Sequence, residues 1–289
     1  MITDYTNKKA VITGAASGIG RALAVGMAER GADLLIVDIR GEALEPVAEE
    51  IRALGREAYT LQADVSLEDE CQKIFDKTMG IFGRCDILVN NAGVSSGGSV
   101  TSIPARDIYW VYETNVYSHW YMMKRFIPQM ESQGEKCQIL NVCSIAGLIT
   151  LADSPVYFSS KHAAVALSEC VWKTLKNKGS NIDLAIFCPG FIQTNLWDAD
   201  SYRPERYAVD DSDPYYSSAA FKAYPVHIKE TLDNSEPLQP MIDKVFDMLG
   251  KEQFFILTHD QFDGLIRAQG VFQADMVRPI DPSLFAKKS

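Results

Sequence analysis

The sequence predicts one α/β domain in which seven parallel strands form a doubly wound sheet with helices on both faces. Short β-branched apolar runs alternate with amphipathic stretches of helical period from residue 9 onward, which is typical of repeated βαβ units. A glycine-rich turn separates the first apolar run from the first helical stretch. The length of 289 residues lies near the upper limit of a single core, and the pattern gives no reason to divide it.

The elements follow from the two periodicities, taken in chain order. Strands are expected at the short apolar runs Ala10–Thr13, Asp33–Ile39, Ala58–Gln62, Ile87–Asn90, Gln138–Cys143, Asp183–Cys188 and Phe254–Thr258. Helices are expected where apolar residues recur every three or four positions, at Gly20–Arg30, Glu42–Leu54, Glu68–Ile81, Ala105–Gln133, Tyr157–Asn177 and Leu238–Leu249.

Two segments depart from this alternation. Residues 191–235 hold three prolines, eight acidic residues and eight aromatic residues. A long irregular segment inside a compact domain is usually functional or disordered, and its aromatic content favours a lid over a substrate site. Residues 260–289 form a C-terminal extension with a weakly amphipathic run at Phe262–Phe272, suited to cap a sheet edge or a subunit interface.

Charge and composition exclude several classes of protein. The chain has 28 basic and 38 acidic residues, a net charge of −10, which disfavours nucleic acid and anionic membranes as partners. The sequence has no apolar stretch of about 18 residues that could span a bilayer. Its opening residues, Met1-Ile2-Thr3-Asp4, do not resemble a signal peptide, so a cytoplasmic location is expected.

Neither the cysteines nor the histidines suggest a metal site. Six cysteines are present, without a C-x-x-C pair, and are expected to be reduced thiols of the core: Cys71, Cys85, Cys137, Cys143, Cys170 and Cys188. The histidines lack ligand spacing and are His119, His162, His227 and His259. His162, although it follows Lys161, is expected to turn away from the functional site.

The glycine-rich turn, Thr13 to Gly20, is the first candidate for cofactor binding. Its glycines are Gly14, Gly18 and Gly20, in the spacing G-x-x-x-G-x-G rather than G-x-G-x-x-G. Glycines between a strand and a helix allow a tight bend and let the main chain approach a pyrophosphate, which the helix N-terminus attracts. Ser17 and Ile19 lie in the same turn and are counted with it.

Asp38 predicts which dinucleotide binds there. It ends the second expected strand, 18 positions after Gly20, close to the offset at which a carboxylate accepts hydrogen bonds from the adenosine ribose. A 2′-phosphate would meet this negative charge, so NAD is favoured over NADP. Arg40 keeps NADP open as the less favoured choice, because an arginine can cover a 2′-phosphate.

Tyr157 and Lys161 are the candidates for chemistry. Four positions apart on a helix, their side chains share one face. Spacing alone is weak, since Tyr5 and Lys9 have it too. The context is stronger: Ser144 precedes Tyr157 by 13 residues, at the end of a strand whose carboxyl edge would face the cofactor crevice.

Taken together, these motifs resemble the classical short-chain dehydrogenase/reductase family, which has a Rossmann-type fold. The matching residues keep the family's order and approximate spacing, and they are the glycine turn, Asp64-Val65, Asn90-Asn91-Ala92-Gly93, Asn115, Ser144, Tyr157-x-x-x-Lys161 and Pro189–Thr194. The match runs from about residue 8 to residue 194 and resumes near Phe254. The glycine spacing, which departs from the general fingerprint, is the one this family uses.

The resemblance implies a catalytic role for four residues. Tyr157 would take the substrate's hydroxyl proton during alcohol oxidation, or donate it during ketone reduction, while hydride moves to or from the nicotinamide. Lys161 would stabilise the tyrosinate and hold the ribose. Ser144 would bind the substrate oxygen, and Asn115 would position a water that links Lys161 to solvent.

It also implies cofactor contacts beyond the turn. Asp64 and Val65 would contact the adenine ring. The backbone at Asn91 and Gly93 would pass under the adenosine ribose. The nicotinamide carboxamide would be held by Ile192 and Thr194.

The leading hypothesis is therefore an NAD-dependent oxidoreductase that interconverts a secondary alcohol and a ketone, with an apolar or aromatic substrate. Two alternatives stay open: an NADPH-linked ketoreductase and a catalytically silent dinucleotide-binding sensor. No metal is expected. The resemblance further implies a homotetramer or homodimer, associated through the long helices expected at Ala105–Gln133 and Tyr157–Asn177.

Overall fold

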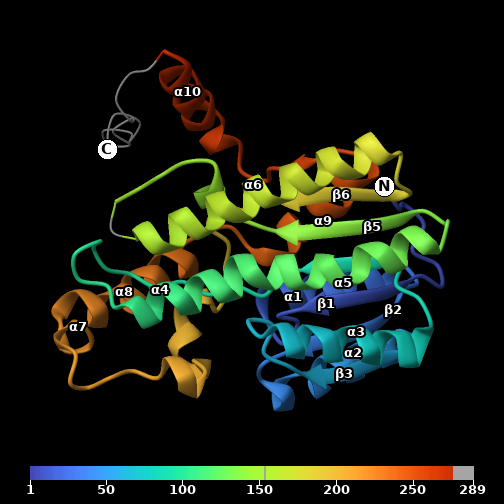
Figure 1. The fold of residues 1–289 in the computed structure, drawn as a ribbon, viewed down its shortest axis with the longest axis horizontal. Coiled ribbons are helices and arrows are strands. Elements are labelled where there is room, and N and C mark those ends of the chain that lie inside the picture. Colours follow the sequence, from blue (N-terminus) through green and yellow to red (C-terminus); the bar gives the residue numbers. More distant parts are fainter. Residues whose placement is uncertain (153, 276–289) are drawn as a thin grey trace.

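The computed structural model describes residues 1–152 and 154–275, and its centre is one parallel sheet with strand order β3-β2-β1-β4-β5-β6-β7 (Figure 1). The strands are β1 (Lys9–Thr13), β2 (Asp33–Asp38), β3 (Ala58–Gln62), β4 (Ile87–Asn90), β5 (Cys137–Val142), β6 (Ile182–Phe187) and β7 (Phe255–Ile256). All neighbouring pairs are parallel. The predicted fold class, a doubly wound seven-stranded sheet in one domain, is confirmed.

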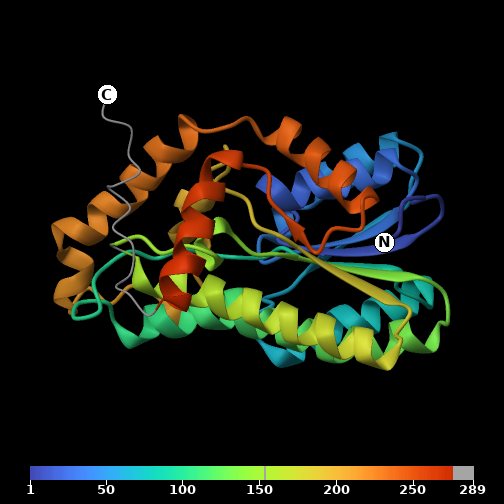
Figure 2. The same ribbon diagram turned by 90° about the horizontal axis from the view of Figure 1, so that it is seen from above.

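The helices lie in two layers, one on each face of the sheet (Figure 2). They are α1 (Gly18–Glu29), α2 (Glu45–Ala53), α3 (Glu68–Phe82), α4 (Ala105–Tyr112), α5 (Ser118–Ser132), α6 (Pro155–Lys178), α7 (Pro214–Ser217), α8 (Ala219–Asp233), α9 (Leu238–Gly250) and α10 (Asp263–Ala274). Of these, α1, α2 and α9 pack on one face and α3, α5 and α6 on the other.

The sheet is buried on both faces, which explains the uninterrupted apolar runs in the sequence. Every residue of β2 is buried, and alternate residues enter opposite cores: Leu34 and Ile36 face α1, whereas Leu35 and Val37 face α3. β1 lies between β2 and β4, so the strand order reverses beside it. At such a point the flanking loops diverge and leave a crevice at the carboxyl ends of the strands.

Two elements differ in detail from their predictions, the first inside a helix whose two ends were predicted correctly and the second in the length of a strand. The helix expected at Ala105–Gln133 is interrupted by a π-helical turn, Glu113–Tyr117, which separates α4 from α5. Such turns commonly mark functional positions, and this one contains Asn115. The last strand, expected at Phe254–Thr258, pairs only through Phe255 and Ile256, because it is an edge strand with β6 as its one partner.

The segment 191–235 is not an irregular loop, as expected, but carries the short helix α7, the 15-residue helix α8 and two 3-10 turns. The side chain of Asp213 caps α7 and that of Ser218 caps α8, each by accepting from a backbone N–H. The capping residues favour the start of each helix, and α8 continues through Pro225 in its interior. The aromatic residues had masked the helical period.

A buried ion pair fixes this segment to α4. Asp107, on α4, accepts hydrogen bonds from Arg203 Nη1 at 2.8 Å and from the Tyr216 hydroxyl at 2.5 Å. Its other oxygen accepts from Ser96 Oγ at 2.8 Å. The Arg203 guanidinium also stacks 4.0 Å from the ring of Trp110. The first part of the segment is therefore anchored.

The C-terminal extension begins with α10, which stands away from the body of the molecule in Figure 1. None of the α10 residues with a described exposure is buried, so the burial of α10 gives no support to the suggested cap on the sheet edge. The remainder of the extension, residues 276–289, lies outside the described residues.

The thiols agree with expectation except at one position. Five of the six cysteines are buried and free. Cys170 is exposed on α6, so its assignment to the core is wrong. Over residues 1–152 and 154–275, the helices lack the length and apolar content needed to cross a membrane.

Candidate active site

A cavity of about 390 Å³ opens at the carboxyl edge of the sheet and extends from the glycine turn to α6 and α8. This volume falls within the usual range for small-molecule sites. Of the predicted site residues, the following line it: Gly14, Ser17, Gly18, Ile19, Asp38, Asp64, Val65, Asn91, Gly93, Ser144, Tyr157, Lys161, Ile192 and Thr194. Gly20 and Asn115 do not line the cavity and lie behind its wall.

The glycine turn is shaped by close backbone contacts. Gly14 and Gly18 have positive φ angles of 64° and 54°, which glycine adopts without strain. A Cβ on Gly20 would lie 2.1 Å from the carbonyl oxygen of Gly14, so only glycine fits there. Gly20 therefore lets α1 start tightly against the turn, while Gly18 begins α1 in the cavity wall.

Asn91 holds the turn in place. Its side-chain amide donates to the carbonyl oxygens of Thr13 at 2.9 Å and Gly14 at 3.0 Å. Both hydrogen bonds of the side-chain amide are therefore made within the protein. A ligand can contact Asn91 only where this residue lines the cavity. The free N–H groups at the start of α1 remain available to an anion.

Asp38 lies at the end of β2, lines the cavity and is buried. One of its oxygens accepts from the backbone N–H of Ala16 at 3.0 Å, and the other accepts from the backbone N–H of Arg40 at 3.0 Å. Arg40 in turn donates to Ser17 Oγ at 2.9 Å and stacks 4.5 Å from the ring of Tyr202. Asp38 therefore supports the turn and brings a negative charge to this end of the cavity.

Asp64 is partly engaged by the segment 191–235. One of its oxygens pairs with Arg206 Nη1 at 2.7 Å, and the other accepts from the backbone N–H of Ser66 at 3.1 Å. Tyr202 and Pro204 of the same segment line the cavity nearby. Residues far along the sequence thus close the end of the cavity that holds Asp38 and Asp64.

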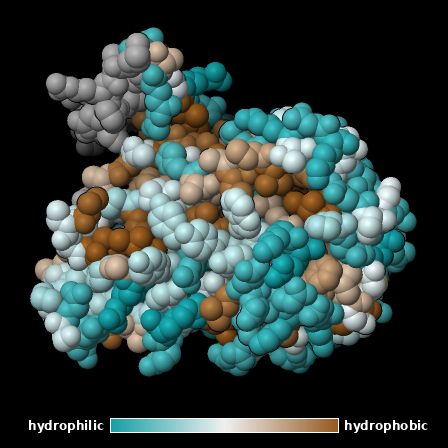
Figure 3. All heavy atoms as spheres, viewed as in Figure 1, coloured by the Kyte–Doolittle hydropathy of each residue, from teal (hydrophilic) through white to brown (hydrophobic). Residues whose placement is uncertain are grey.

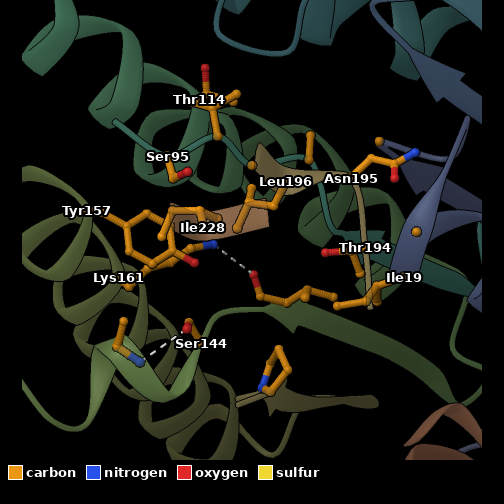
Figure 4. Close-up of a pocket in the computed structure, with 18 of the residues that line it drawn as sticks. Ile19, Ser95, Thr114, Ser144, Tyr157, Lys161, Thr194, Asn195, Leu196 and Ile228 are labelled. Carbon is orange, nitrogen blue, oxygen red and sulfur yellow. Dashed lines mark hydrogen bonds between the residues drawn. The ribbon is translucent and has the colours of Figure 1, made fainter. Parts of the chain in front are cut away.

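Tyr157, Ser144 and Lys161 meet at the opposite end, away from Ile19 and Thr194 (Figure 4). Ser144 is separated from the end of β5 by one residue. Its hydroxyl oxygen accepts from the backbone N–H of Ala146 at 3.1 Å. The hydroxyl proton is then free to point into the cavity. α6 carries both Tyr157 and Lys161, and the ammonium of Lys161 lies 5.7 Å from the centre of the Tyr157 ring.

The protonation of these groups is governed by burial. Burial raises the pKa of Tyr157 to about 12, although a hydrogen bond with Ser144 lowers it in part. Burial also lowers the pKa of Lys161 below its ordinary value. Without a cofactor's charge, the phenol is therefore protonated at neutral pH, and the lysine alone does not acidify it.

Asn115 supports the site from behind. It is fully buried in the π-helical turn, where its side chain accepts from the Val94 N–H at 2.8 Å and donates to the Val94 carbonyl at 2.9 Å. It also donates to Ser160 Oγ at 3.1 Å. The side chain of Asn115 thus joins the loop after β4 to α6.

Several lining residues escaped the sequence reasoning. They come from the loop after β4, α4, the segment before α6, the 3-10 turn Leu196–Tyr202, α8 and the start of the C-terminal extension, and are Ser95, Trp110, Ile149, Ser154, Leu196, Tyr224, Ile228 and Phe262. Only the aromatic content of residues 191–235 had signalled part of this set. The others lack any local signature, because they meet only in the folded chain.

The structural role of His259 at the site was not predicted from the sequence either. Its Nδ1 accepts from the Gly190 N–H at 3.2 Å, and its Nε2 lies 3.1 Å from the Phe191 carbonyl oxygen, so the ring spans both residues. A Cβ on Gly190 would lie 2.8 Å from the ring. His259 thus fixes the backbone where it lines the cavity. Among the described residues, no group of three or more His, Cys, Asp or Glu side chains is placed to hold a metal.

Comparison with known proteins places the chain in a family. The family model of the short chain dehydrogenases matches residues 8–204. A CLA biosynthesis dehydrogenase/reductase from Lactiplantibacillus plantarum is 39% identical over 263 residues, covering 91% of this chain and 92% of that protein. The 7alpha-hydroxysteroid dehydrogenase of Escherichia coli K12 is 35% identical over 188 residues, covering 65% of this chain and 72% of that protein.

The fold has a solved counterpart as well. A short chain dehydrogenase/reductase from Burkholderia phymatum, in complex with NAD, matches with a TM-score of 0.92 and 31% identity over 98% of this chain and 99% of that one. The match of the family model and this likeness over the whole length agree with the glycine turn and the Tyr157–Lys161 pair. The chain belongs to the short chain dehydrogenase family, whose members are oxidoreductases that use NAD(P).

Proposed function

We propose that the chain is an NAD-dependent dehydrogenase that interconverts a secondary alcohol and a ketone on a largely apolar substrate. The observation that carries this proposal is the single cavity that joins the glycine turn to Tyr157, Ser144 and Lys161. Gly14 and Gly18 leave room for the pyrophosphate of a dinucleotide, and Asp38 stands where the adenosine ribose would lie. The residues present therefore fit this cofactor.

The proposed mechanism uses three side chains of this chain. Bound NAD would supply the hydride acceptor or donor. Tyr157 would take the proton of the substrate hydroxyl during oxidation and return it during ketone reduction. Ser144, whose oxygen already accepts from the Ala146 N–H, would donate its proton to the substrate oxygen and orient it.

Lys161 would hold the ribose and favour the tyrosinate. Its ammonium is buried, and the hydrogen bond found for it, to the Val142 carbonyl, is long at 3.5 Å. Lys161 lines the cavity, and among the described residues this bond is the one hydrogen bond of its ammonium. A buried cation with unused donors suits a ribose with two adjacent hydroxyls.

Substitutions of Lys161 and Ser144 should separate these two roles. In Lys161→Met, we expect turnover to fall by at least ~100-fold and the Kd for NAD to rise by about 10-fold, since both ribose binding and tyrosinate stabilisation are lost. In Ser144→Ala, turnover should fall by ~100-fold with an unchanged Kd. Steady-state kinetics and NADH fluorescence titration measure the two effects. Equal losses of NAD affinity in both variants would contradict the assigned roles.

We propose NAD rather than NADP as the cofactor, because the buried Asp38 carboxylate would oppose a 2′-phosphate. Arg40, the residue that could offset this charge, is engaged with Asp38 and Ser17. Titration of the purified protein with NADH and NADPH tests the preference, and NADH should bind at least ~10-fold more tightly. Equal or tighter binding of NADPH would overturn it and favour the NADPH-linked alternative.

An apolar substrate is supported by the walls around Tyr157. These walls consist mainly of Trp110, Ile145, Ile149, Leu196, Ile228 and Leu232. One relative is named a 7alpha-hydroxysteroid dehydrogenase, and a hydroxysteroid is an apolar compound with a hydroxyl group. This name supports the same class of substrate for this chain. Turnover confined to charged or sugar-like compounds would contradict it.

We propose that α8 is the lid that was expected within residues 191–235. α8 contributes Tyr224, His227, Ile228 and Thr231 to the cavity, yet Leu232 is its one buried residue. A helix that covers a cavity while burying so little surface can move at low cost. The part of the segment anchored by Asp107 and Arg203 would act as the fixed end of this lid.

We also propose a homo-oligomer formed through the long helices. Tyr109, Tyr117 and Trp120, on and between α4 and α5, are exposed by 61%, 45% and 57%. Figure 3 shows further hydrophobic side chains in the band that α6 crosses on the same face. Large aromatic side chains gathered on one face commonly mark a contact between subunits.

A further inference from the structure

Among the hydroxyl groups of the cavity wall that the proposed mechanism does not use, three lie close to one another. They belong to Ser95, Ser154 and Tyr224, and all three residues line the cavity. Ser95 follows β4 in its loop, Ser154 precedes α6, and Tyr224 lies on α8. Figure 4 places Ser95 at the same end of the cavity as Tyr157, away from Ile19 and Thr194. Three separate elements thus bring hydroxyls to one part of an apolar wall.

The hydrogen bonds within this group leave capacity for a ligand. Ser154 Oγ donates its proton to the Ser96 carbonyl at 2.8 Å. The Tyr224 hydroxyl lies 3.4 Å from Ser154 Oγ, beyond the 2.5–3.0 Å of a strong O–H···O bond. Burial raises the pKa of Tyr224 above its ordinary value, so the phenol keeps its proton. The hydroxyls of Ser154 and Ser95 are its neighbours, and its proton is available to a better acceptor than either.

The position of the Tyr224 ring does not depend on its hydroxyl. The ring packs against the backbone of the loop after β4, where a Cβ on Gly97 would lie 2.3 Å from Tyr224 Cδ2. The Tyr215 hydroxyl donates to the Gly97 carbonyl at 2.7 Å and steadies the same loop. Shape therefore places the ring, and a phenylalanine would occupy the same space.

The charge of the wall selects the kind of group that can bind. The acidic and guanidinium groups that line the cavity, Asp38, Arg40 and Asp64, surround its opposite end. Near Tyr157 the described lining has one ammonium, Lys161, and one imidazole, His227, which is exposed on α8. Because the proposed mechanism assigns Lys161 to the ribose and to Tyr157, these hydroxyls offer only neutral donors, which suit a neutral oxygen better than a carboxylate.

We propose that Tyr224, with Ser95 and Ser154, binds a second, neutral oxygen of the substrate. The substrate would then be an apolar compound with two oxygen functions: one that reacts at Tyr157 and one, a hydroxyl or carbonyl, that accepts from Tyr224. This inference rests on the proposed function, and it names the substrate class of the same site. Tyr224 would determine which substrates are preferred. A substrate without the second oxygen would leave the hydroxyls of Tyr224, Ser95 and Ser154 without a strong hydrogen-bond partner.

The test compares bicyclic ketones of one skeleton, such as decalones, with and without a second carbonyl at increasing distances from the first. For the native protein, we expect the best dicarbonyl compound to exceed the monoketone in kcat/KM by ~10-fold, as one good hydrogen bond provides. Tyr224→Phe should remove this preference, with kcat/KM falling by ~10-fold for the dicarbonyl compound and much less for the monoketone. Tyr59→Phe, a partly exposed tyrosine on β3 outside the cavity, is the matched control and should keep the preference.

Two results would overturn the inference. One is a native protein that handles mono- and dicarbonyl compounds equally. The other is a Tyr224→Phe variant that loses activity on both to the same extent, because this would indicate a structural role. Ser95→Ala provides a second variant and should reduce the preference by about 3-fold.

Binding separates this inference from the proposed function. Calorimetric titration of the Tyr157→Phe variant, saturated with NAD, measures whether the dicarbonyl compound binds more tightly than the monoketone without any turnover. A ~10-fold difference supports the inference whatever the catalytic role of Tyr157, and equal affinities contradict it.

Discussion

Tyr157→Phe is expected to lower kcat by about 10³-fold or more while the Kd for NAD changes by less than about 2-fold. The phenylalanine keeps the ring in the cavity wall but removes the oxygen that would exchange the proton. Because Lys161 and the glycine turn are untouched, the cofactor site should persist. Steady-state kinetics on a ketone panel and NADH titration measure the two quantities.

The pH dependence should agree with this role. In the ligand-free chain the pKa of Tyr157 is about 12, because burial disfavours the tyrosinate. The positive charge of oxidised nicotinamide and the ammonium of Lys161 favour the tyrosinate, so bound NAD should lower this pKa toward neutrality. Alcohol oxidation should therefore become faster as pH rises through the lowered pKa, since the base form of Tyr157 accepts the proton.

Two outcomes would count against the catalytic assignment. If Tyr157→Phe kept most of its turnover, another group would move the proton. If neither the native chain nor the variant turned over any carbonyl compound while both bound NADH, the silent sensor would be the better account. If Tyr157→Phe lost both turnover and NAD binding, the substitution would instead have damaged the fold, which circular dichroism would detect.

Arg203→Ala is expected to reduce the free energy of unfolding by about 3–5 kcal/mol, because it leaves the Asp107 carboxylate buried without its cation. The side chain of Arg203 is 4% exposed and that of Asp107 is fully buried. Tyr216 and Ser96 would still donate to Asp107, but two neutral hydroxyls do not replace a guanidinium that contacts both oxygens at 2.8 and 3.2 Å. Urea denaturation of the variant and the native chain measures the difference.

A neighbouring ion pair provides the control. Arg106, also on α4, pairs with Asp210 of the same segment at 3.0 Å, but both side chains are more than a third exposed. Arg106→Ala should cost less than about 1 kcal/mol, since exposed pairs contribute little. If both variants lost a similar free energy of unfolding, the buried pair of Arg203 and Asp107 would not stabilise the fold more than the exposed pair does.

The same substitution should affect the site through the lid. Arg203 lies between the two 3-10 turns, Leu196–Tyr202 and Glu205–Tyr207, which precede α7 and α8 in the same segment. When its anchor is lost, we expect KM for the ketone to rise by several-fold at temperatures where the variant remains folded. An unchanged KM would mean that α8 is held independently of Asp107.

The sequence by itself determined the order of the strands and of the helices between them, and it identified the cofactor and catalytic part of the cavity lining. Alternation of buried strands with amphipathic helices is a local pattern, and it leads to a parallel sheet whose carboxyl edge gathers the motifs that end the strands. For this reason the glycine turn, Asp38, Ser144, Tyr157 and Lys161 could be assigned to one site before any coordinates were known. Local departures from regular geometry were not predicted, as in the π-helical turn around Asn115.

Only the tertiary structure decided how the substrate end of the cavity is built. Tyr224, Ser154 and Ser95 come from an inserted helix, a helix start and a loop, and nothing in their neighbouring residues indicates that they meet. The same holds for Arg203 with Asp107 and for His259 with Gly190, which are separated by 96 and 69 positions. Local periodicity specifies elements, whereas these contacts depend on how distant side chains fill shared space, which no local pattern encodes.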